Sequence, residues 1–250
     1  MKIRFIGAHN TEAGPAKLPG VLVDEVLALD AGCLNSLMIP EQLALKSVLI
    51  THQHYDHLRD LPILGMNLQL NSASLAVHGP LETRVVLTKY LLNGVLYPRF
   101  LEGSILDYHL INPGEPFWAD GYNILPVAMR HSVPAVGYEI SAKGKRLFYS
   151  GDTGPGLSDV WEHLRPDLII IEVTAPNSQT SFGCKAGHLS ASLLQEELAS
   201  FKKLNGYLPP VYVVHMNPFE ENDIQAELVE VEHALNCHIT PAHEGLEIEV

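Results

Sequence analysis

The most chemically informative stretch of the chain is Thr51-His52-Gln53-His54-Tyr55-Asp56-His57, which places four potential metal ligands within six consecutive positions. A neutral imidazole nitrogen and a carboxylate oxygen both bind zinc at about 2.0–2.2 Å. In an extended segment His52 and His54 point the same way, because side chains alternate, so they can chelate one ion together. Asp56 and His57 lie past the turn and can face a second ion. A loop that is His-rich by chance seldom combines three histidines and an aspartate at this spacing.

These ligands need a rigid base, and the flanking sequence predicts a strand, a loop and a helix. Lys46–Thr51 is an apolar run of strand length, and Leu58–Leu70 suits a helix. A strand tip that opens into a helix holds such a loop rigidly. Three other residues, His131, Asp152 and His215, which the family resemblance described below selects, each follow another apolar strand-like run. A side chain in that position emerges at the rim of a sheet.

In the rest of the chain, the sequence predicts mainly strands toward the N-terminus and alternating strands and helices toward the C-terminus. The predicted strands are Ile3–Ile6, Val21–Val23, Val26–Leu29, Ile105–Ile111, Tyr122–Met129, Val136–Ser141, Arg146–Ser150, Asp167–Val173 and Val211–His215. The predicted helices are Ser190–Lys203 and Glu220–Leu235, with Leu81–Leu101 as a helical candidate flap over the site. No repeat or linker divides the chain, so we expect one domain over residues 1–250. This pattern predicts an α/β fold of four αββα layers, with two mixed sheets face to face and helices outside.

The composition narrows the class of protein. The chain has 250 residues, of which 46% are apolar and 18% charged, as in a compact folded protein. No apolar run approaches the ~20 residues that span a bilayer, and no signal-peptide pattern is present, so we expect a cytoplasmic protein. The net charge of −13 disfavours an extended nucleic-acid groove but allows one small phosphate beside bound metal ions. Three widely spaced cysteines are expected to be reduced and mostly buried.

The histidine-rich run resembles the H-x-H-x-D-H signature of the metallo-β-lactamase superfamily, and segments similar to its other motifs follow in order. These segments are Leu29-Asp30-Ala31-Gly32, Met129-Arg130-His131-Ser132, Ser150-Gly151-Asp152-Thr153 and Val213-Val214-His215-Met216. The resemblance implies two divalent ions. The first ion would be bound by His52, His54 and His131, the second by Asp56, His57 and His215, and both by Asp152. We expect Zn²⁺, with Mn²⁺ or Fe²⁺ as alternatives for a His/Asp site.

Two further segments resemble a phosphodiesterase branch of that superfamily, which includes the tRNA 3′-end endonuclease RNase Z and the class II cyclic-nucleotide phosphodiesterases. They are Ile170-Ile171-Glu172-Val173-Thr174 and Gly187-His188-Leu189-Ser190. In that branch the glutamate orients the histidine, which protonates the leaving alcohol, and such a general acid contributes ~10²–10⁴-fold. The resemblance therefore implies His188, Glu172 and Asp56 as catalytic residues. A hydroxide held between the two ions would be the nucleophile.

The substrate class has several alternatives. The run Glu172-Val173-Thr174-Ala175-Pro176-Asn177 looks closer to the cyclic-nucleotide enzymes than to RNase Z. RNase Z also carries a long basic arm between its third motif and its bridging aspartate, whereas His131 and Asp152 are only 21 positions apart. We expect a small phosphodiester, with a 3′,5′-cyclic nucleotide first. The alternatives are an RNA-processing endonuclease of RNase Z type, a carboxylic ester or lactone hydrolase with the same metals, and a metal-dependent binding or sensor protein without turnover.

Several other polar residues have a predicted place. His9 and Asn10 follow the first strand, and Tyr55 and Asn217 adjoin ligands, so all four are candidates for the pocket wall. His243 is expected in a surface turn rather than at the metals. The remaining histidines are predicted to be structural or at the surface: His78, His109, His163, His233 and His238. The resemblance allows a homodimer, since dimers are common among relatives, but the sequence offers no independent sign of one.

Overall fold

The strands form two seven-stranded sheets in the computed structural model, which describes all residues from 1 to 250. The first sheet has the order β14 (Glu247–Glu249), β1 (Lys2–Gly7), β2 (Gly20–Val23), β3 (Leu27–Leu29), β4 (Ser47–Leu49), β5 (Leu75–Gly79) and β6 (Leu106–Leu110). The second has the order β13 (Ile239–Pro241), β12 (Val211–Val214), β11 (Leu168–Glu172), β10 (Lys145–Tyr149), β9 (Val136–Ala142), β8 (Tyr122–Ala128) and β7 (Phe117–Ala119). Both sheets are mixed, because each joins an antiparallel half to a parallel half.

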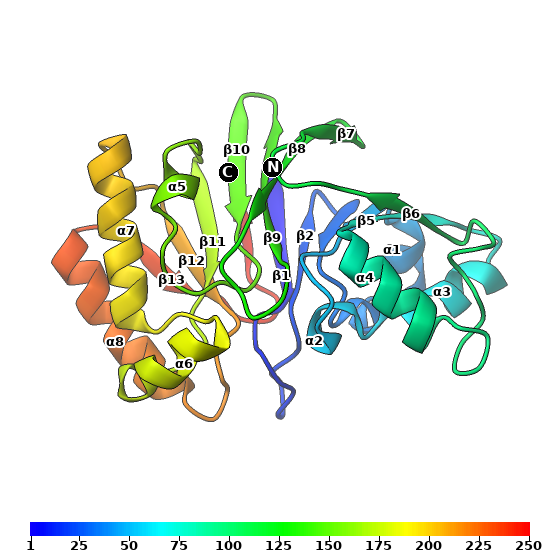
Figure 1. Cartoon of the computed structure of the whole chain (residues 1–250), viewed down its shortest axis with the longest axis horizontal. Helices are drawn as coiled ribbons and strands as arrows, with labels where there is room; N and C mark the ends of the chain where they lie inside the picture. Colours follow the sequence, from blue (N-terminus) through cyan, green and yellow to red (C-terminus); the bar gives the residue numbers. More distant parts are fainter.

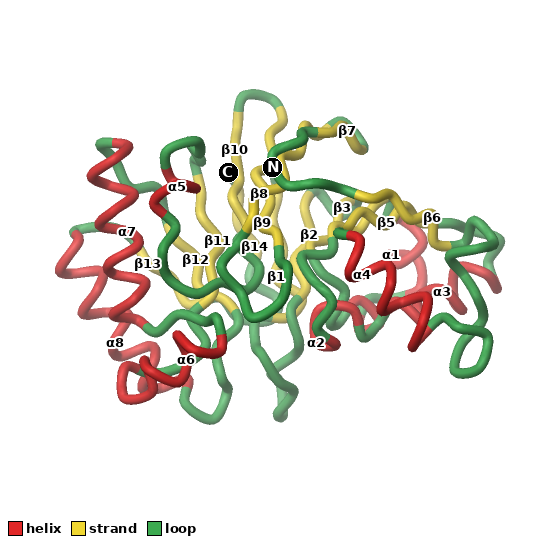
Figure 2. Tube along the Cα trace, in the orientation of Figure 1, coloured by secondary structure: helices red, strands yellow, loops and turns green.

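The helices lie on the outer faces of the two sheets (Figures 1 and 2). They are α1 (Ile39–Ala44), α2 (Tyr55–Leu58), α3 (Leu61–Leu70), α4 (Leu81–Val86), α5 (Ser158–Trp161), α6 (Thr180–Ala186), α7 (Ala191–Asn205) and α8 (Glu221–Leu235). Short turns η1 (Leu34–Ser36), η2 (Leu87–Leu91) and η3 (Asn177–Gln179) complete the set. None of the helices combines the length and the apolar character that crossing a membrane requires.

Alternation along the strands divides the apolar side chains among three cores. In β2, Val21 and Val23 enter the core between the sheets, whereas Leu22 faces the helices on the first sheet. In β11, Ile170 enters the same central core and Ile171 faces the helices on the second sheet. Strands buried on both faces need helices or a second sheet on each side, because successive side chains point to opposite faces. The predicted four-layer αββα fold is confirmed.

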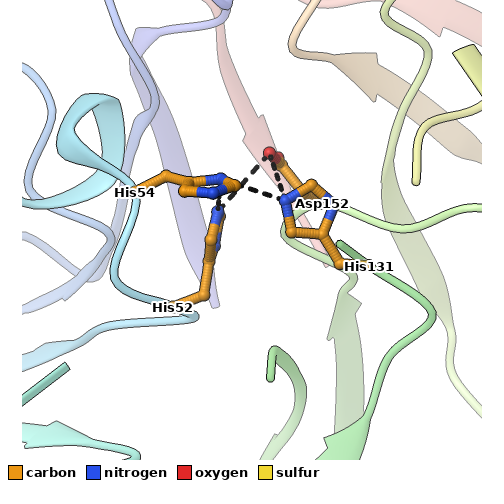
Figure 3. A group of neighbouring side chains, drawn as sticks. All are labelled: His52, His54, His131 and Asp152. Carbon is orange, nitrogen blue, oxygen red and sulfur yellow. Dashed lines mark hydrogen bonds and ion pairs between the residues drawn. The ribbon is translucent and has the colours of Figure 1, made fainter. Parts of the chain in front are cut away.

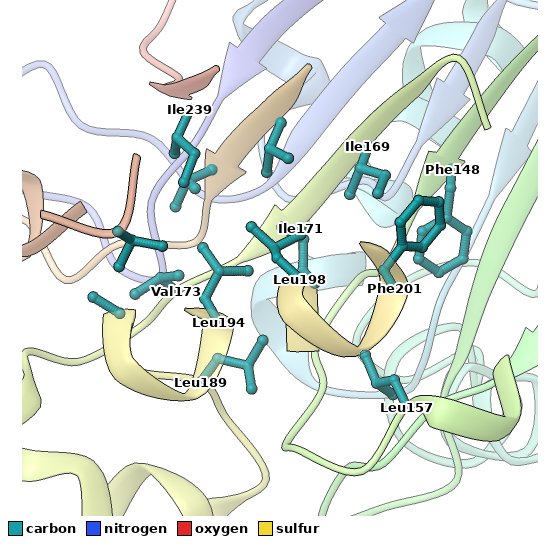
Figure 4. Close-up of a cluster of buried hydrophobic side chains, with 14 of the residues drawn as sticks. Phe148, Leu157, Ile169, Ile171, Val173, Leu189, Leu194, Leu198, Phe201 and Ile239 are labelled. Atoms are coloured by element: carbon teal, nitrogen blue, oxygen red, sulfur yellow. The ribbon is translucent and has the colours of Figure 1, made fainter. Parts of the chain in front are cut away.

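The outer core of the second sheet shows how one helix is attached (Figure 4). Leu194, Leu198 and Phe201 of α7 are fully buried and recur at helical spacing, so one stripe of the helix faces the sheet. Burial of each such side chain contributes about 1.5–3 kcal/mol relative to exposure. This packing holds α7 beside the loop that follows β10.

Some local elements lie close to the bounds predicted from the sequence, and others begin or end at different residues. The chain turns at Asp24-Glu25, between two of the predicted strands, with left-handed φ angles of 49° and 62°. The helix predicted at Leu58–Leu70 is instead two helices, α2 and α3, with Pro62 in the first turn of α3. The strand predicted at Lys46–Thr51 is shorter, because the chain leaves the sheet after β4 to form the histidine-rich loop.

Two expectations from the sequence are corrected. Leu81–Leu101 is helical only through α4 and η2, and Leu87, Leu92 and Phe100 are buried in the outer core of the first sheet. The segment therefore covers a sheet, and none of its residues lines the cavity at the predicted site. Of the three free cysteines, Cys184 is exposed rather than buried.

A buried carboxylate anchors the loop after β10. Glu197 of α7 is only 6% exposed and accepts three hydrogen bonds. Its donors are the backbone N–H groups of Gly156 at 2.6 Å and Leu157 at 3.1 Å, and Nε1 of Trp161 at 3.1 Å. The loop that these bonds hold begins after Tyr149 and contains Asp152.

We expect Glu197→Ala to lower the free energy of unfolding by about 3 kcal/mol, because it leaves the buried donors of Leu157 and Trp161, and the partly buried N–H of Gly156, without an acceptor. The matched control is Glu196→Ala, one position away and exposed, which should change the free energy by less than about 0.5 kcal/mol. Urea denaturation followed by circular dichroism measures both changes. Equal losses in the two variants would show that the buried hydrogen bonds are not the cause.

Candidate metal centre

Each predicted ligand follows a strand, and the strand directions bring those strand ends to one edge of the sandwich. β3 and β4 are parallel, so Asp30 and the histidine-rich loop emerge together. β8, β10, β11 and β12 all run the same way in the second sheet. His131, Asp152 and His215 follow three of these four strands. Residues far apart in the chain therefore converge at the edge where both sets of strands end.

The first ligand group consists of His52, His54, His131 and Asp152 (Figure 3). Nε2 of His52 lies 3.0 Å from Nδ1 of His54, and Nε2 of His131 lies 3.1 Å from the same atom. Oδ2 of Asp152 lies 3.7 Å from Nε2 of His52 and 3.9 Å from Nε2 of His131. The four ligand atoms all lie within 4.8 Å of one another. Three imidazoles and one carboxylate at this spacing suit one divalent ion.

The second ligand group consists of Asp56, His57, His215 and, again, Asp152. Nε2 of His57 lies 3.3 Å from Oδ2 of Asp56 and 3.2 Å from Oδ1 of Asp152. Nε2 of His215 lies 3.2 Å and 3.4 Å from the same two oxygens. Asp152 thus turns Oδ2 to the first group and Oδ1 to the second. Its carboxylate lies between the two groups, as the resemblance implied for a bridging ligand.

Hydrogen bonds behind the ligands fix which imidazole nitrogen faces inward. Nδ1 of His131 donates to the carbonyl oxygen of Gly187 at 2.9 Å, so Nε2 is left for the centre. Nδ1 of His57 donates to Oδ2 of the buried Asp30 at 2.8 Å. A carboxylate or carbonyl behind a histidine is the usual outer partner of a metal ligand, since it sets the tautomer and the ring orientation.

Two threonine hydroxyls do the same for other ligands. Nδ1 of His52 donates to Oγ1 of Thr51 at 3.0 Å, and Nδ1 of His215 donates to Oγ1 of Thr174 at 2.7 Å. Each hydroxyl can accept because its own proton goes to a buried carboxylate. Neither threonine was predicted as a site residue, although Thr51 precedes His52 and Thr174 lies two positions after Glu172.

These donor atoms fit divalent cations. Nδ1 of His52 and Nδ1 of His131 each donate a hydrogen bond to a group outside the cluster, so Nε2 of each ring carries a lone pair. Both lone pairs face Nδ1 of His54, which can donate a hydrogen bond to only one of them. Burial lowers the pKa of all three imidazoles and so favours the neutral, ligating form. Oδ1 of Asp152 is buried without a hydrogen-bond donor. A cation in each group would satisfy atoms that the protein leaves unsatisfied.

Charges differ between the two groups. Although burial opposes ionisation, His215 and His57 hold the pKa of Asp152 well below its ordinary value, so the bridge is an anion. Burial lowers the pKa of His57. The three carboxylates of Asp152, Asp30 and Asp56 outweigh burial and raise the pKa of His57 well above the usual range. A cation entering the second group must therefore displace a proton from His57.

His188 lies beside both groups, held by a buried glutamate. Nδ1 of His188 donates to Oε1 of Glu172 at 2.7 Å and lies 4.0 Å from Oδ2 of Asp152. Glu172 is fully buried and also accepts from the N–H of Thr153 at 2.9 Å and the hydroxyl of Thr174 at 2.7 Å. Burial lowers the pKa of His188, but the Glu172 carboxylate outweighs burial and raises it to about 9. His188 therefore carries a proton at neutral pH, and Nε2 has no partner in the protein.

A cavity of about 450 Å³ opens onto these side chains. Its wall combines the loop after β1, the start of α2 and the ligands themselves: Asn10, Thr11, Leu18, His54, Tyr55, Asp56, Asp152, His188 and His215. No lysine or arginine is among them, so histidines are the only side chains in the wall that can carry a positive charge toward an anionic group.

The structure brings together all seven predicted ligands and the His188–Glu172 pair. Asn10 and Tyr55 line the cavity, as predicted for the pocket wall. His9 and Asn217 do not: His9 is buried behind the wall, and Asn217 donates to a neighbouring glutamate. His243 is exposed in a turn, as expected. The other five histidines belong to neither ligand group: His78, His109, His163, His233 and His238.

Known proteins share this sequence pattern and fold. A family profile described as "Beta-lactamase superfamily domain" matches residues 21–216. Ribonuclease Z of Pyrococcus horikoshii is 28% identical over 156 residues, which cover 58% of this chain and 50% of that protein. The chain thus spans about half the length of the curated relatives that it matches first.

Solved structures agree at the level of the fold. The metallo-β-lactamase fold protein YhfI from Bacillus subtilis aligns with a TM-score of 0.80 and 19% identity, over 100% of this chain and 99% of that one. Unliganded yeast PDE1 aligns with a TM-score of 0.85 and 17% identity, over the same shares of the two chains. The family profile matches most of the chain, residues 21–216, and the fold agrees with it, so the chain belongs to the β-lactamase superfamily.

Proposed function

We propose that the protein is a metal-dependent hydrolase that cleaves a small phosphodiester, with a 3′,5′-cyclic nucleotide as the first candidate. The observation that carries this proposal is the position of His188. It is held by a buried glutamate beside two adjacent ligand groups, and it lines the cavity that opens onto them. A proton donor in this place suits a reaction that expels an alkoxide.

Each of the two ligand groups would bind one metal ion. His52, His54 and His131 would hold the first ion, Asp56, His57 and His215 the second, and Asp152 both. When bound, two divalent ions would lower the pKa of a water molecule and offset negative charge on the phosphoryl oxygens. The imidazole-rich donor set favours Zn²⁺, with Mn²⁺ and Fe²⁺ as the other candidates.

The remaining chemistry belongs to the His188–Glu172 pair. Glu172 accepts a hydrogen bond from Nδ1 of His188 and so fixes the orientation of the ring. The proton on Nε2 of His188 can then be donated to the departing oxygen. Because the pKa of His188 is raised to about 9, the acid form dominates at neutral pH. The anionic Glu172 stabilises the imidazolium before transfer and orients the neutral imidazole afterwards.

Cavity size and charge support a small substrate. A volume of about 450 Å³ lies in the range of small-molecule sites. The absence of lysine and arginine from the wall disfavours a polyanion, because its phosphates outside the centre would meet no cationic side chains.

An RNA-processing endonuclease of RNase Z type is the second candidate, favoured by the Ribonuclease Z relatives. Between His131 and Asp152 the chain forms only β9 and β10, joined by a turn at Lys143-Gly144. That hairpin leaves no room for the basic arm which the RNase Z resemblance calls for. The net charge of −13 also weakens binding to tRNA.

Metal removal combined with a substrate panel tests the proposal. The protein, stripped with a chelator and dialysed, should lose hydrolysis of cyclic nucleotides and of bis(p-nitrophenyl) phosphate, and recover it with Zn²⁺ or Mn²⁺. The panel includes a lactone series and a tRNA precursor. Hydrolysis of lactones alone, cleavage of the tRNA precursor alone, or metal binding without any turnover would each replace the proposed function by the corresponding alternative.

A further inference from the structure

One carboxylate, that of Glu244, closes the loop that forms one wall of the cavity. We call Ala8–Leu18 the wall loop, since Asn10, Thr11 and Leu18 face the cavity. Oε1 of Glu244 accepts from the backbone N–H of Lys17 at 2.8 Å, near the end of the loop, and from that of Ala8 at 3.3 Å, at its start. A single oxygen from near the C-terminus therefore ties both ends of the wall loop together.

The wall loop in turn holds the backbone of a predicted ligand. The N–H of His215 donates to the carbonyl oxygen of Ala8 at 2.6 Å, and the N–H of Asn10 donates to that of Met216 at 3.2 Å. His215 has a left-handed φ of 65°, which is uncommon for a residue other than glycine. Such a conformation persists only where the surrounding structure holds it. The backbone of Ala8 therefore links the two residues, because its N–H donates to Glu244 and its carbonyl oxygen accepts from His215.

A buried histidine completes the arrangement around Glu244. Nδ1 of His9 lies 2.8 Å from Oε1 of Glu244, and Nε2 of His9 lies 3.4 Å from Oε2 of Glu221 at the start of α8. Burial raises the pKa of Glu244, but the bonds from His9 and Lys17 outweigh it and lower that pKa below the usual value. The carboxylate is thus an anion paired with His9. Both residues lie outside positions 21–216, where the family profile matches.

We propose that Glu244 is a positioning residue, which fixes the wall loop and, through the backbone N–H and carbonyl of Ala8, orients His215 toward the second metal position. The proposal rests on the proposed metal centre and is independent of which substrate is cleaved. Glu244 contacts neither ligand group, so its effect must pass through the backbone.

Two variants and one charge-matched control test the proposal. Glu244→Ala removes the acceptor, and Glu244→Gln keeps a carbonyl oxygen for the Lys17 and Ala8 amides while losing the charge. Glu249→Ala removes an exposed carboxylate from β14 in the same C-terminal segment. The readouts are amide hydrogen exchange of the metal-free protein and Zn²⁺ affinity, measured by competition with a chromogenic chelator.

In Glu244→Ala we expect faster exchange confined to the wall loop and residues 215–217. The second Zn²⁺ should bind ~10–100-fold more weakly while the first binds as in the wild type, because only the second group contains His215. Glu244→Gln should show intermediate changes in both readouts, and Glu249→Ala should show none. If the alanine variant does not fold, the glutamine variant carries the test.

Three results would overturn the positioning role. They are unchanged exchange and affinity in both Glu244 variants, exchange that rises uniformly over the whole chain, and equal weakening of both Zn²⁺ ions. A wild-type protein that binds none of Zn²⁺, Mn²⁺ and Fe²⁺ would overturn the proposed function as well. Two ions bound normally by the variants would overturn the positioning role alone.

Discussion

Replacement of His188 by alanine is expected to lower kcat for an alkyl phosphodiester by about 10²–10⁴-fold, the usual contribution of a general acid. The metal content should stay at the wild-type value, because His188 belongs to neither of the two four-residue ligand groups. KM should change little, since the lost interaction develops mainly in the transition state. Steady-state kinetics with a cyclic nucleotide, together with metal analysis, measure these effects.

The leaving group separates proton donation from a general disturbance of the site. p-Nitrophenolate departs without protonation, so His188→Ala should lose much less activity on bis(p-nitrophenyl) phosphate than on a cyclic nucleotide. His163→Ala, which replaces an exposed histidine next to α5, is the matched control and should retain full activity. Equal losses on both substrates would contradict a general-acid role.

The Glu172→Gln variant tests the carboxylate behind the same imidazole. Glu172 favours the protonated form of His188, so its loss lowers the pKa of His188. A general acid is active below its pKa, and the alkaline limb of the kcat profile should therefore move to lower pH in this variant. An alkaline limb at the wild-type position would show that His188 is not the group that titrates.

Asp152→Asn is expected to have the second large effect, because Asp152 is the one side chain shared by both ligand groups. Replacing an outer partner of a metal ligand typically weakens binding 10–100-fold, so loss of a charged bridging ligand should cost at least about 100-fold in affinity. Two cations also repel each other more strongly without the anion between them. The variant should retain at most one ion by metal analysis.

Turnover by Asp152→Asn should fall by about 10³-fold, since metal catalysis supplies several kcal/mol of transition-state stabilisation. The control Asp107→Asn replaces an exposed carboxylate on the edge strand β6 and should keep two ions. A fully metallated Asp152→Asn protein would show that Asp152 does not bridge. Because the asparagine preserves the side-chain shape, circular dichroism should confirm that the fold is retained.

Short-range patterns were sufficient for the main layout of this protein. The run His52 to His57 identified a ligand cluster because its side chains are neighbours along the chain, where spacing alone controls geometry. Apolar runs identified β4, β11 and β12, because strands buried on both faces are continuous in apolar residues. Ligands placed directly after such runs had to lie at a rim of a sheet.

Long-range contacts set the remaining features. β5, in the interior of the first sheet, was not predicted, because Leu75–Gly79 is short and includes His78, a polar residue in an apolar run. Leu81–Leu101 was expected over the site, but its apolar residues pack on the outside of the first sheet. Period and propensity describe a segment, whereas the face that it covers depends on which distant side chains are free to receive it.

The partners behind the ligands depend on the same long-range pairing. Asp30 is 27 positions from His57, and Glu244 is 236 positions from Ala8, so no local spacing connects them. His215 has a left-handed backbone, and its N–H donates to Ala8 of the wall loop, which is more than 200 positions away in the chain. Ligand identity is a property of residue type and local order, and so it is visible in the chain. Ligand orientation comes from hydrogen bonds between segments, which exist only after both sheets have folded against each other.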